Sequence, residues 1–281
     1  MYIKAPAKIN LALNILDKRE DGYHDLDMII VPLDLHDSIE IEIFRGSDTT
    51  YITCDEVSLA SNKYNLASIA IKKARDIYHF KENFEITIHK EIPISAGLGG
   101  GSANAAAVLI AIFKLLKITP TKQELIDLAK TIGADVPYCL FNTPSRVSGI
   151  GEFVEPIACK NKYFVLIVKP QQGLSTKEVF SQCDQKTYKN ADIPTIIDAL
   201  KTGDDVLLSN NMSNALQDTA INMLPAIKDI IDGLHKDGLS AVMMSGSGSA
   251  VFALSHDHHL LSKLEKKYDN LGYEVVLTKT I

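Results

Sequence analysis

The sequence has little cysteine, and the cysteines it has are not arranged for disulfide or metal chemistry. Its 281 residues include only four, with no C-x-x-C pair and no histidine at zinc spacing. We therefore expect isolated thiols in a reducing compartment. The four are Cys54, Cys139, Cys159 and Cys183.

Long apolar runs are also missing. The longest uninterrupted one covers residues 105–113, whereas a bilayer-spanning helix needs about 20 residues. The first residues lack the charged start and apolar run of a signal peptide. We expect a cytoplasmic protein with no membrane partner, and leave its oligomeric state open between monomer and homodimer.

A surplus of positive charge is absent as well. Lys and Arg number 29 against 35 Asp and Glu, a formal net charge of -6. Because duplex-binding proteins normally carry a basic surplus, we expect no nucleic-acid partner, although a small basic site for one anionic ligand remains open. At about 150 residues per domain, the length suits two domains or one large one.

The hydrophobic pattern predicts strands that lead into a block of helices. Apolar residues alternate over 9–15, the pattern of a half-buried strand, and Asp21-Gly22 is a good hairpin turn. Thr121 and Glu124 form a capping-box sequence at the start of a helix that stops at Gly133. The remaining predicted elements are a returning strand through 26–30, strands at 39–43, 84–88 and 163–168, and helices over 65–79 and from Ser102. This order favours an α+β fold.

A segment rich in Gly, Pro, Ser and Asn runs from 141 to 162. We place a domain boundary there, which gives domains 1–152 and 153–281. Further on, we expect a helix from Pro225 to Gly238, two short strands around 245–249, a helix and a last strand at 273–279.

The most informative segment is the glycine-rich run at 93–106, P-I-S-A-G-L-G-G-G-S-A-N-A-A. Glycines let successive backbone N–H groups converge on an anion, and a following helix adds the positive end of its dipole. The run is neither a Walker A loop nor a dinucleotide fingerprint, because no G-K-[ST] follows and Ser102 replaces the third glycine. We interpret it as a phosphate loop; the alternative is a structural turn that binds nothing.

Two other segments carry charged residues that phosphoryl transfer could use. In P-A-K-I-N-L at 6–11, the strand pattern places Lys8 and Asn10 on one face. In G-A-D-V-P at 133–137, Asp135 follows a helix end. An Asp can accept or orient the proton of an attacking hydroxyl, and a Lys can stabilise the transferred phosphoryl group. Read alone, Lys8 could lie on a solvated edge strand and Asp135 could be a turn or cap residue.

The P-x-x-x-G-L-G run resembles the phosphate loop of the GHMP kinases, named for galactokinase, homoserine kinase, mevalonate kinase and phosphomevalonate kinase. Much of that family has two serines after G-L-G, whereas this chain has Gly100 and Gly101 before Ser102. The departure leaves open which hydroxyl touches phosphate or Mg²⁺, and Ser102 is our candidate for the metal contact.

Five motifs in order, between residues 6 and 249, resemble one branch of this family: P-A-K-I-N-L, D-G-Y-H at 21–24, the glycine loop, G-A-D-V-P and M-S-G-S-G-S at 244–249. The resemblance implies a two-domain fold, with a ribosomal-protein-like α/β domain followed by a ferredoxin-like α+β domain. It implies an enzyme that uses Mg-ATP to phosphorylate the 2-hydroxyl of 4-diphosphocytidyl-2-C-methyl-D-erythritol, in the methylerythritol phosphate route to isoprenoids.

The same resemblance implies roles for individual residues. Lys8 and Asp135 would be the catalytic pair, with Asn10 positioning the acceptor. The substrate would contact Tyr23, His24, Thr176, Phe180, Gly246 and Ser247. ATP would contact Asn65, Pro93, Ile94, Ser95, Ala96, Gly97, Leu98, Gly99, Gly100, Gly101, Ser102 and Ala103. Structural alternatives exist for several of these: Asn65 could be a helix N-cap, Phe180 a core residue and 245–249 a tight hairpin.

Two other functions fit parts of this pattern. Another small-molecule GHMP kinase, such as homoserine or mevalonate kinase, would share the fold, but its acceptor has no nucleobase for Tyr23 and His24 to bind. A non-catalytic module on the same scaffold could bind RNA. The negative net charge opposes that alternative, as does the presence of both Lys8 and Asp135.

Overall fold

The computed structural model describes residues 1–20, 22–45, 49–56, 65–183 and 190–281. The chain forms two compact units whose segments alternate along the sequence. Unit 1 comprises Met1–Ala7, Leu35–Ile92 and Gly99–Asn142, and unit 2 comprises Lys8–Asp34, Pro93–Leu98 and Thr143–Ile281. The domain boundary after residue 152 stays a prediction.

Two long strands, β1 (Tyr2–Lys18) and β2 (His24–Ile43), open the chain and contribute to both units. Asp21 of the predicted turn lies outside the described residues, while Gly22 has a φ of 86°, in the region that favours glycine. The half-buried pattern predicted for 9–15 is wrong, because both faces of β1 are covered. Lys8 and Asn10 are only 3% and 1% exposed.

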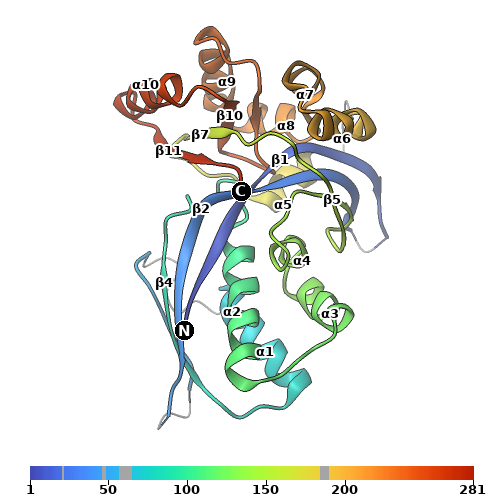
Figure 1. Cartoon of the computed structure of the whole chain (residues 1–281), viewed down its shortest axis with the longest axis vertical. Helices are drawn as coiled ribbons and strands as arrows, with labels where there is room; N and C mark the ends of the chain where they lie inside the picture. Colours follow the sequence, from blue (N-terminus) through green and yellow to red (C-terminus); the bar gives the residue numbers. More distant parts are fainter. Residues whose placement is uncertain (21, 46–48, 57–64, 184–189) are drawn as a thin grey trace. The chain divides into compact units, whose positions relative to one another are not determined.

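The described residues of unit 1 form a small sheet and the helices α1 to α4 (Figure 1). Residues 38–43 of β2 pair antiparallel with β4, and β4 pairs parallel with β3. Helix α2 is rich in alanine and is buried along most of its length, which lets α1 pack against it. These elements are β3 (Tyr51–Cys54), β4 (Phe84–His89), α1 (Leu66–Tyr78), α2 (Gly100–Leu116), α3 (Lys122–Ile132) and α4 (Val136–Cys139).

The helix signals in this unit are confirmed. Thr121 accepts from the backbone N–H of Glu124, and the Glu124 side chain accepts from the Thr121 backbone, so the capping box is complete. The hydrogen bonds that the Glu124 carboxylate accepts from the backbone N–H and the hydroxyl of Thr121 lower its pKa. Gly133 ends the helix as expected.

Some strands of unit 2 pair with the two long strands. β1 pairs parallel with β8 (Ser213–Asn214), and residues 26–30 of β2 pair antiparallel with β5 (Ser145–Gly149). β5 in turn pairs with β6 (Phe153–Pro156). Both strands lie in the stretch 141–162, which the sequence analysis treated only as a boundary because turn-forming residues dominate its composition.

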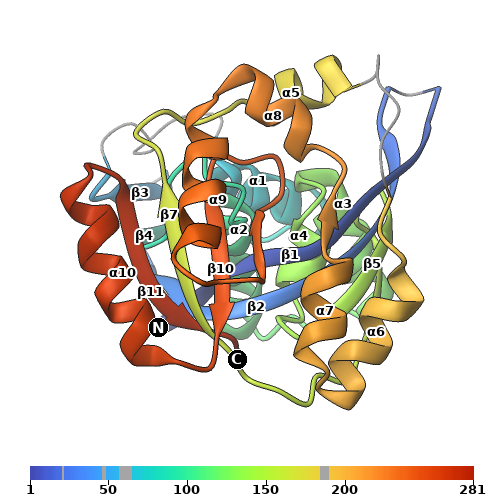
Figure 2. The ribbon, with the colours of Figure 1, turned by 90° about the horizontal axis from the view of Figure 1, so that it is seen from above.

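The rest of unit 2 is built on an antiparallel sheet in the order β11-β7-β10-β9. Helices α9 and α10 pack on one side of it (Figure 1, Figure 2). The predicted strands, and the helix that follows Pro225, are confirmed. The bounds are β7 (Phe164–Lys169), β9 (Val242–Met244), β10 (Val251–Ser255), β11 (Glu274–Lys279), α9 (Ala226–Lys236) and α10 (His258–Asn270).

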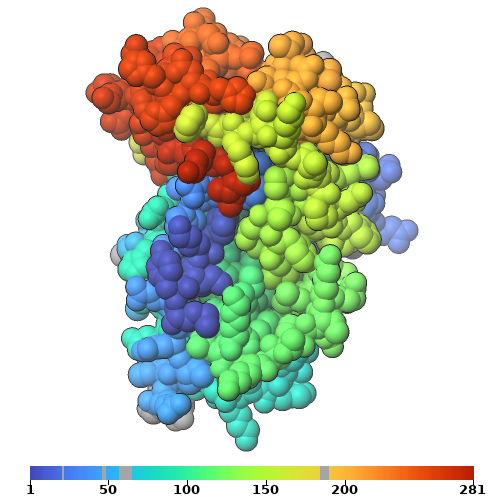
Figure 3. All heavy atoms as spheres, viewed as in Figure 1, coloured from blue at the N-terminus to red at the C-terminus, as the bar shows by residue number. Residues whose placement is uncertain are grey.

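Four helices between β7 and α9 were not assigned from the sequence: α5 (Thr176–Cys183), α6 (Ile193–Thr202), α7 (Asp205–Asn211) and α8 (Gln217–Met223). The C-terminal segment, red in Figure 3, lies beside the yellow-green segment that leads into β7, and Thr280 N–H donates to the Tyr163 carbonyl at 2.9 Å. Within the described residues, no helix is both long and apolar enough to cross a bilayer. Cys139 and Cys183 are buried, and Cys54 and Cys159 are partly exposed.

Candidate functional site

The first half of the glycine loop, residues 93–98, lies in unit 2 and packs against the loop at 245–249. Gly97 has a φ of 73°, and a Cβ atom there would lie 2.0 Å from the carbonyl oxygen of Ser245. The Ser245 hydroxyl donates to the Gly97 carbonyl at 3.0 Å. Further along, Ala250 N–H donates to the Ala96 carbonyl at 3.3 Å. Only glycine fits at position 97, because the two loops touch there. Residues 93–98 and 245–249 therefore form one continuous surface.

Lys8 brings β1 to this surface. Its backbone N–H donates to the Leu98 carbonyl at 3.0 Å, and its ammonium donates to Asn10 Oδ1 at 2.8 Å. The prediction that Lys8 and Asn10 share a face is therefore confirmed. A Cβ atom on Gly246 would lie 3.2 Å from Lys8 Nζ, so the ammonium sits directly beside this glycine. The solvated edge-strand interpretation of Lys8 is excluded.

Asn214 is a residue that the sequence analysis missed. It is only 7% exposed, and its Nδ2 donates to the carbonyls of Met244 and Gly246 at 2.9 and 2.8 Å. Its Oδ1 accepts from Leu216 N–H at 3.0 Å. A single asparagine on a two-residue strand leaves no periodic signal, which is why only the folded chain identifies it.

Two other pairs connect α5 to residues expected to bind substrate. The rings of His24 and Phe180 stack with centroids 5.3 Å apart and an interplanar angle of 26°. The hydroxyls of Thr176 and Ser247 are 2.8 Å apart and hydrogen-bonded. Tyr23 is 58% exposed. Phe180 thus contacts His24 itself, and its role in covering a base stays a prediction.

An open cavity of about 580 Å³ lies beside the start of the glycine loop in unit 2. Its wall includes Ile94 and Ser95 on the loop, residues 173–175, and the charged side chains of Lys169 and Glu178. Lys169 is an ion-pair partner of Glu274 at 2.8 Å. The cavity therefore combines loop backbone with charges of both signs.

The second half of the glycine loop lies in unit 1, where it begins α2. Gly99 is the N-cap residue with a φ of 74°, and no side chain caps the helix. The first-turn N–H groups of a helix have no carbonyl partner in their own helix, and they carry the positive end of its dipole. This helix start therefore suits phosphate oxygens.

Leu66, the first residue of α1, connects this helix start to the turn that carries Asp135. Its Cδ1 would lie 3.6 Å from a Cβ on Gly101 and 3.7 Å from one on Gly133. The hydroxyl of Ser102 lies 4.0 Å from the same position on Gly133. The Asp135 turn and the Ser102 end of the loop are thus close together within unit 1.

Asp135 is half-buried at the N-cap position of α4, but its side chain makes no capping hydrogen bond. Of the two alternatives for Asp135, the turn is confirmed and the side-chain cap is wrong. The buried residues Val136, Tyr138 and Cys139 hold the turn in place. Burial raises the pKa of the Tyr138 phenol well above its usual value, so this neighbour of Asp135 stays uncharged.

Two asparagines belong to the same part of unit 1. Asn65 caps α1, because its Oδ1 accepts from Ala67 N–H at 2.9 Å. The capping interpretation is confirmed, and a contact of Asn65 with adenine stays a prediction. Asn104 on α2, which no sequence pattern singled out, is 5% exposed. Its Oδ1 is buried without a hydrogen-bond partner among the residues that the structure describes.

The predicted site residues fall into two groups, one in each unit. Unit 1 holds Asn65, Asp135 and the residues Gly99, Gly100, Gly101, Ser102 and Ala103. Unit 2 holds Lys8, Asn10, Tyr23, His24, Thr176, Phe180, Gly246 and Ser247, with residues 93–98 of the loop. Each unit thus holds one half of the glycine loop together with part of the predicted site residues.

Comparison with known families and structures gives one consistent result. The family models of the GHMP kinases N terminal domain and the GHMP kinases C terminal match residues 65–143 and 196–274. A 4-diphosphocytidyl-2-C-methyl-D-erythritol kinase of Clostridium perfringens is 37% identical, with 100% of this chain and 98% of that protein covered. The protein of the same name from Geobacillus thermodenitrificans is 34% identical over 96% of this chain and 92% of its own length.

Solved structures agree with these relatives. A crystal structure of 4-(cytidine 5'-diphospho)-2C-methyl-D-erythritol kinase matches with a TM-score of 0.83 and 28% identity, over 100% of this chain and 99% of that one. A homoserine kinase from Cytophaga hutchinsonii shares the fold, with a TM-score of 0.78 at 18% identity over 100% of this chain and 94% of its own. The predicted two-domain α+β fold is confirmed. The chain therefore belongs to the GHMP kinases and, within them, to the 4-diphosphocytidyl-2-C-methyl-D-erythritol kinases.

Proposed function

We propose that the chain transfers a phosphoryl group from ATP to the 2-hydroxyl of 4-diphosphocytidyl-2-C-methyl-D-erythritol, giving the 2-phosphate and ADP. GHMP kinases use ATP as the phosphate donor. The observation that carries the proposal is the full-length similarity to kinases named for this acceptor, at 34–37% identity. In the methylerythritol phosphate pathway, this step would serve the synthesis of isoprenoid precursors.

The glycine loop is the proposed site for the phosphates of ATP. Its second half supports this role, because α2 begins without a side-chain cap and carries glycines at 99, 100 and 101. Among the residues that the structure describes, a Cβ on Gly101 would come within 4 Å of Leu66 alone, which leaves the backbone there accessible to a bulky anion. When bound, Mg-ATP supplies the γ-phosphoryl group and a metal that neutralises charge on the phosphates. The Ser102 hydroxyl is the proposed protein contact to that metal.

Lys8 and Asp135 are the proposed catalytic pair. The Lys8 ammonium is held by Asn10 and lies beside Gly246, where it would stabilise negative charge on the transferred group. The Asp135 carboxylate, held on a buried turn, would accept or orient the proton of the attacking hydroxyl. Asn10 would then both hold Lys8 and position the acceptor.

The residues of α5 and the β1–β2 turn are the proposed site for the cytidine end of the acceptor. His24 and Phe180 form an aromatic pair, and an aromatic surface beside an exposed Tyr23 suits a pyrimidine. Thr176, Ser247 and Gly246 would contact the acceptor through hydroxyls and backbone. Acceptors such as homoserine and mevalonate have no base to fill this part of the site.

The test is ADP release by the purified chain with Mg-ATP and one acceptor at a time. The acceptors are 4-diphosphocytidyl-2-C-methyl-D-erythritol, the polyol phosphate that lacks the cytidylyl group, homoserine and mevalonate. We expect turnover only with the cytidylyl compound, and none without an acceptor. Turnover with another acceptor would support the proposed ATP site but contradict the proposed acceptor. A folded chain that binds ATP but phosphorylates none of the four would contradict the proposed reaction.

A cytoplasmic location, a state as monomer or homodimer, and the lack of a nucleic-acid partner remain predictions of the sequence. Size-exclusion chromatography with light scattering would distinguish the two oligomeric states.

A further inference from the structure

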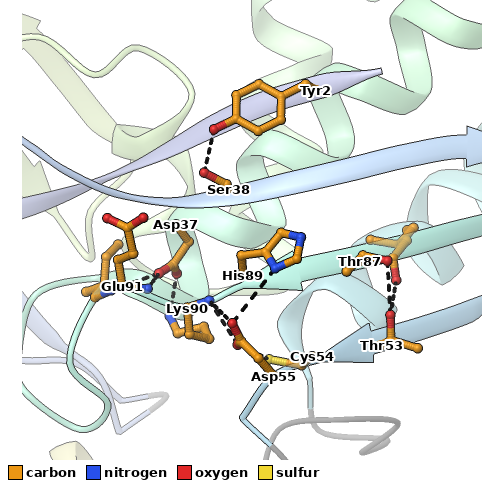
Figure 4. A network of polar contacts seen from close by, with 12 residues as sticks. Tyr2, Asp37, Ser38, Thr53, Cys54, Asp55, Thr87, His89, Lys90 and Glu91 are labelled. Carbon is orange, nitrogen blue, oxygen red and sulfur yellow. Dashed lines mark hydrogen bonds and ion pairs between the residues drawn. The ribbon is translucent and has the colours of Figure 1, made fainter.

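The segment that enters the glycine loop is held by two carboxylates in unit 1 (Figure 4). The backbone N–H of Lys90 donates to both oxygens of Asp55, at 3.0 and 3.1 Å. The N–H groups of Glu91 and Ile92 both donate to Asp37 Oδ1, at 2.9 Å each. Three consecutive backbone N–H groups thus donate to side-chain carboxylates, directly after β4 ends at His89. This pattern fixes the path of the chain immediately before Pro93.

Asp37 also binds the side chain of the same segment. Its Oδ2 accepts a hydrogen bond from the Lys90 ammonium. The Asp37 side chain has no exposed surface, and that of Lys90 is 9% exposed. In a buried pair of this kind, removal of one partner leaves an uncompensated charge. The position of the Lys90 ammonium therefore depends on Asp37.

That ammonium lies at the start of α2. A Cβ atom on Gly100, the first residue of the helix, would be 3.1 Å from Lys90 Nζ and 3.2 Å from Ile92 Cγ2. Lys90 and Ile92 thus fill the space that a side chain at position 100 would need. This packing favours glycine at position 100.

A cation beside the N-terminus of a helix is electrostatically unfavourable, because the helix dipole places positive charge there. Asp37 offsets part of this repulsion through its ion pair with Lys90. A bound phosphate would offset the rest, since it would accept hydrogen bonds from both the ammonium and the first-turn N–H groups. The arrangement is therefore suited to an anion at the Gly100 end of the loop.

We propose that Asp37 is a positioning residue for ATP: it fixes the loop entry at 90–92 and holds the Lys90 ammonium against Gly100, next to the bound phosphates. Asp37 itself touches no substrate in this proposal. The inference rests on the proposed use of the glycine loop for ATP. Its consequence is that Asp37 and Lys90 act on ATP affinity as one unit and leave the acceptor site unaffected.

The experiment measures the dissociation constant of a non-hydrolysable ATP analogue by calorimetry for the wild-type chain, Asp37→Asn, Lys90→Met and the double variant. We expect each single variant to weaken binding by about tenfold, and the double variant to bind about as weakly as either single one. We also expect KM for the acceptor to stay within about threefold of wild type, because neither residue lies in the proposed acceptor site.

The matched control is Asp237→Asn. Asp237 likewise binds a lysine ammonium and a second donor, at 2.6 Å from Lys267 and 3.0 Å from the Tyr268 hydroxyl. Its loss should lower thermal stability without changing nucleotide affinity. If Asp37→Asn does not fold, Lys90→Met still tests the proposal, because it keeps the side-chain stem and leaves the two backbone hydrogen bonds to Asp37 in place.

The outcomes separate this inference from the proposed function. A wild-type chain that binds no ATP analogue would overturn the proposed function and this inference with it. If the wild-type chain binds the analogue and both single variants bind it with the same affinity, even at reduced stability, this inference is overturned and the proposed function is not. Additive losses in the double variant would also overturn it, since they would mean that Asp37 and Lys90 act independently.

Discussion

Asn214 donates a 2.8 Å hydrogen bond from its carboxamide to the carbonyl oxygen of Gly246. The same nitrogen holds the Met244 carbonyl, and Oδ1 holds Leu216 N–H. The side chain thus connects β8 to the loop that faces Lys8. Buried carbonyl and N–H groups that lose a partner are costly, so the loop geometry depends on this asparagine.

We therefore expect Asn214→Ala to destabilise the fold by about 2–3 kcal/mol, since three backbone groups lose their partner. Displacement of Gly246 should also raise KM for the acceptor. Denaturant unfolding and steady-state kinetics measure the two effects. Asn211→Ala is the control, because the hydrogen bond that Asn211 donates, to the Leu207 carbonyl, stays within its own helix. An Asn214 variant with wild-type kinetics would show that the loop holds its shape without it.

Gly97→Ala should be far more harmful than Gly238→Ala, although both glycines have positive φ. A Cβ at position 97 would collide with Ser245 O at 2.0 Å, whereas no atom of the described part of the chain lies within 4 Å of one at position 238. The Gly238 variant should lose only about 1–2 kcal/mol of stability, from the strain of an alanine in the left-handed region. The Gly97 variant must also separate the two loops, so we expect activity to fall by more than its stability explains. Similar losses of stability and activity in both variants would contradict this contact.

Asp135→Asn should leave ATP binding nearly intact and lower turnover by a factor of about 10² or more, the scale for losing a positioned base. The expected retention of ATP binding follows from the backbone and helix-start contacts proposed for the phosphates. Single-turnover kinetics and analogue binding separate the two effects. Wild-type turnover in this variant would remove Asp135 from the mechanism.

Tyr23→Ala should weaken the cytidylyl acceptor and spare ATP. Tyr23 is 58% exposed and Tyr51, on β3, is 52% exposed, so Tyr51→Ala is a control of the same kind at a site with no proposed ligand. We expect KM for the acceptor to rise by about tenfold or more in the Tyr23 variant, given the 1–3 kcal/mol scale of base–aromatic stacking. Equal loss of ATP and acceptor affinity would mean that Tyr23 acts on the fold.

Local signals in the sequence predicted most of the regular elements. The capping box at Thr121, the glycine stop at Gly133 and the helix after Asn65 depend on neighbouring residues, so the sequence contains the whole signal. By contrast, β5 and β6 form in a stretch of turn residues because β2 provides a partner for Ser145–Gly149. Such long-range pairing has no local signature.

The same distinction holds for the site. Lys8 and Asp135 could be found because they stand in motifs of fixed spacing, although the burial of Lys8 on a two-sided strand was not foreseen. Asp37 and Asn214 could not be found, because each acts on backbone groups that are distant in sequence: 54 residues from Asp37 to Glu91 and 32 from Asn214 to Gly246. Residues that position a loop depend on the tertiary fold, and one sequence gives no spacing rule for them.

Asp205 predicts a pH dependence of stability in unit 2. Burial raises the pKa of its carboxyl group, but hydrogen bonds from Tyr163, Asn161 and His256 outweigh this effect and lower the pKa below the usual 3.8. Those bonds measure 2.7, 2.9 and 2.8 Å. A carboxyl group with a lowered folded-state pKa stabilises the fold above its unfolded pKa, and this contribution is lost as the pH falls through the folded value.

Asp205→Asn should therefore be less stable than wild type at pH 6, and the gap should close as the pH falls below about 4. Because the carboxylate is 46% exposed, we expect a gap of only about 1 kcal/mol. Denaturant unfolding from pH 6 to pH 3 measures it, with wild type and Asp205→Asn compared at each pH. A gap that stays constant over this range would mean that Asp205 contributes through its hydrogen-bonding shape and not through its charge.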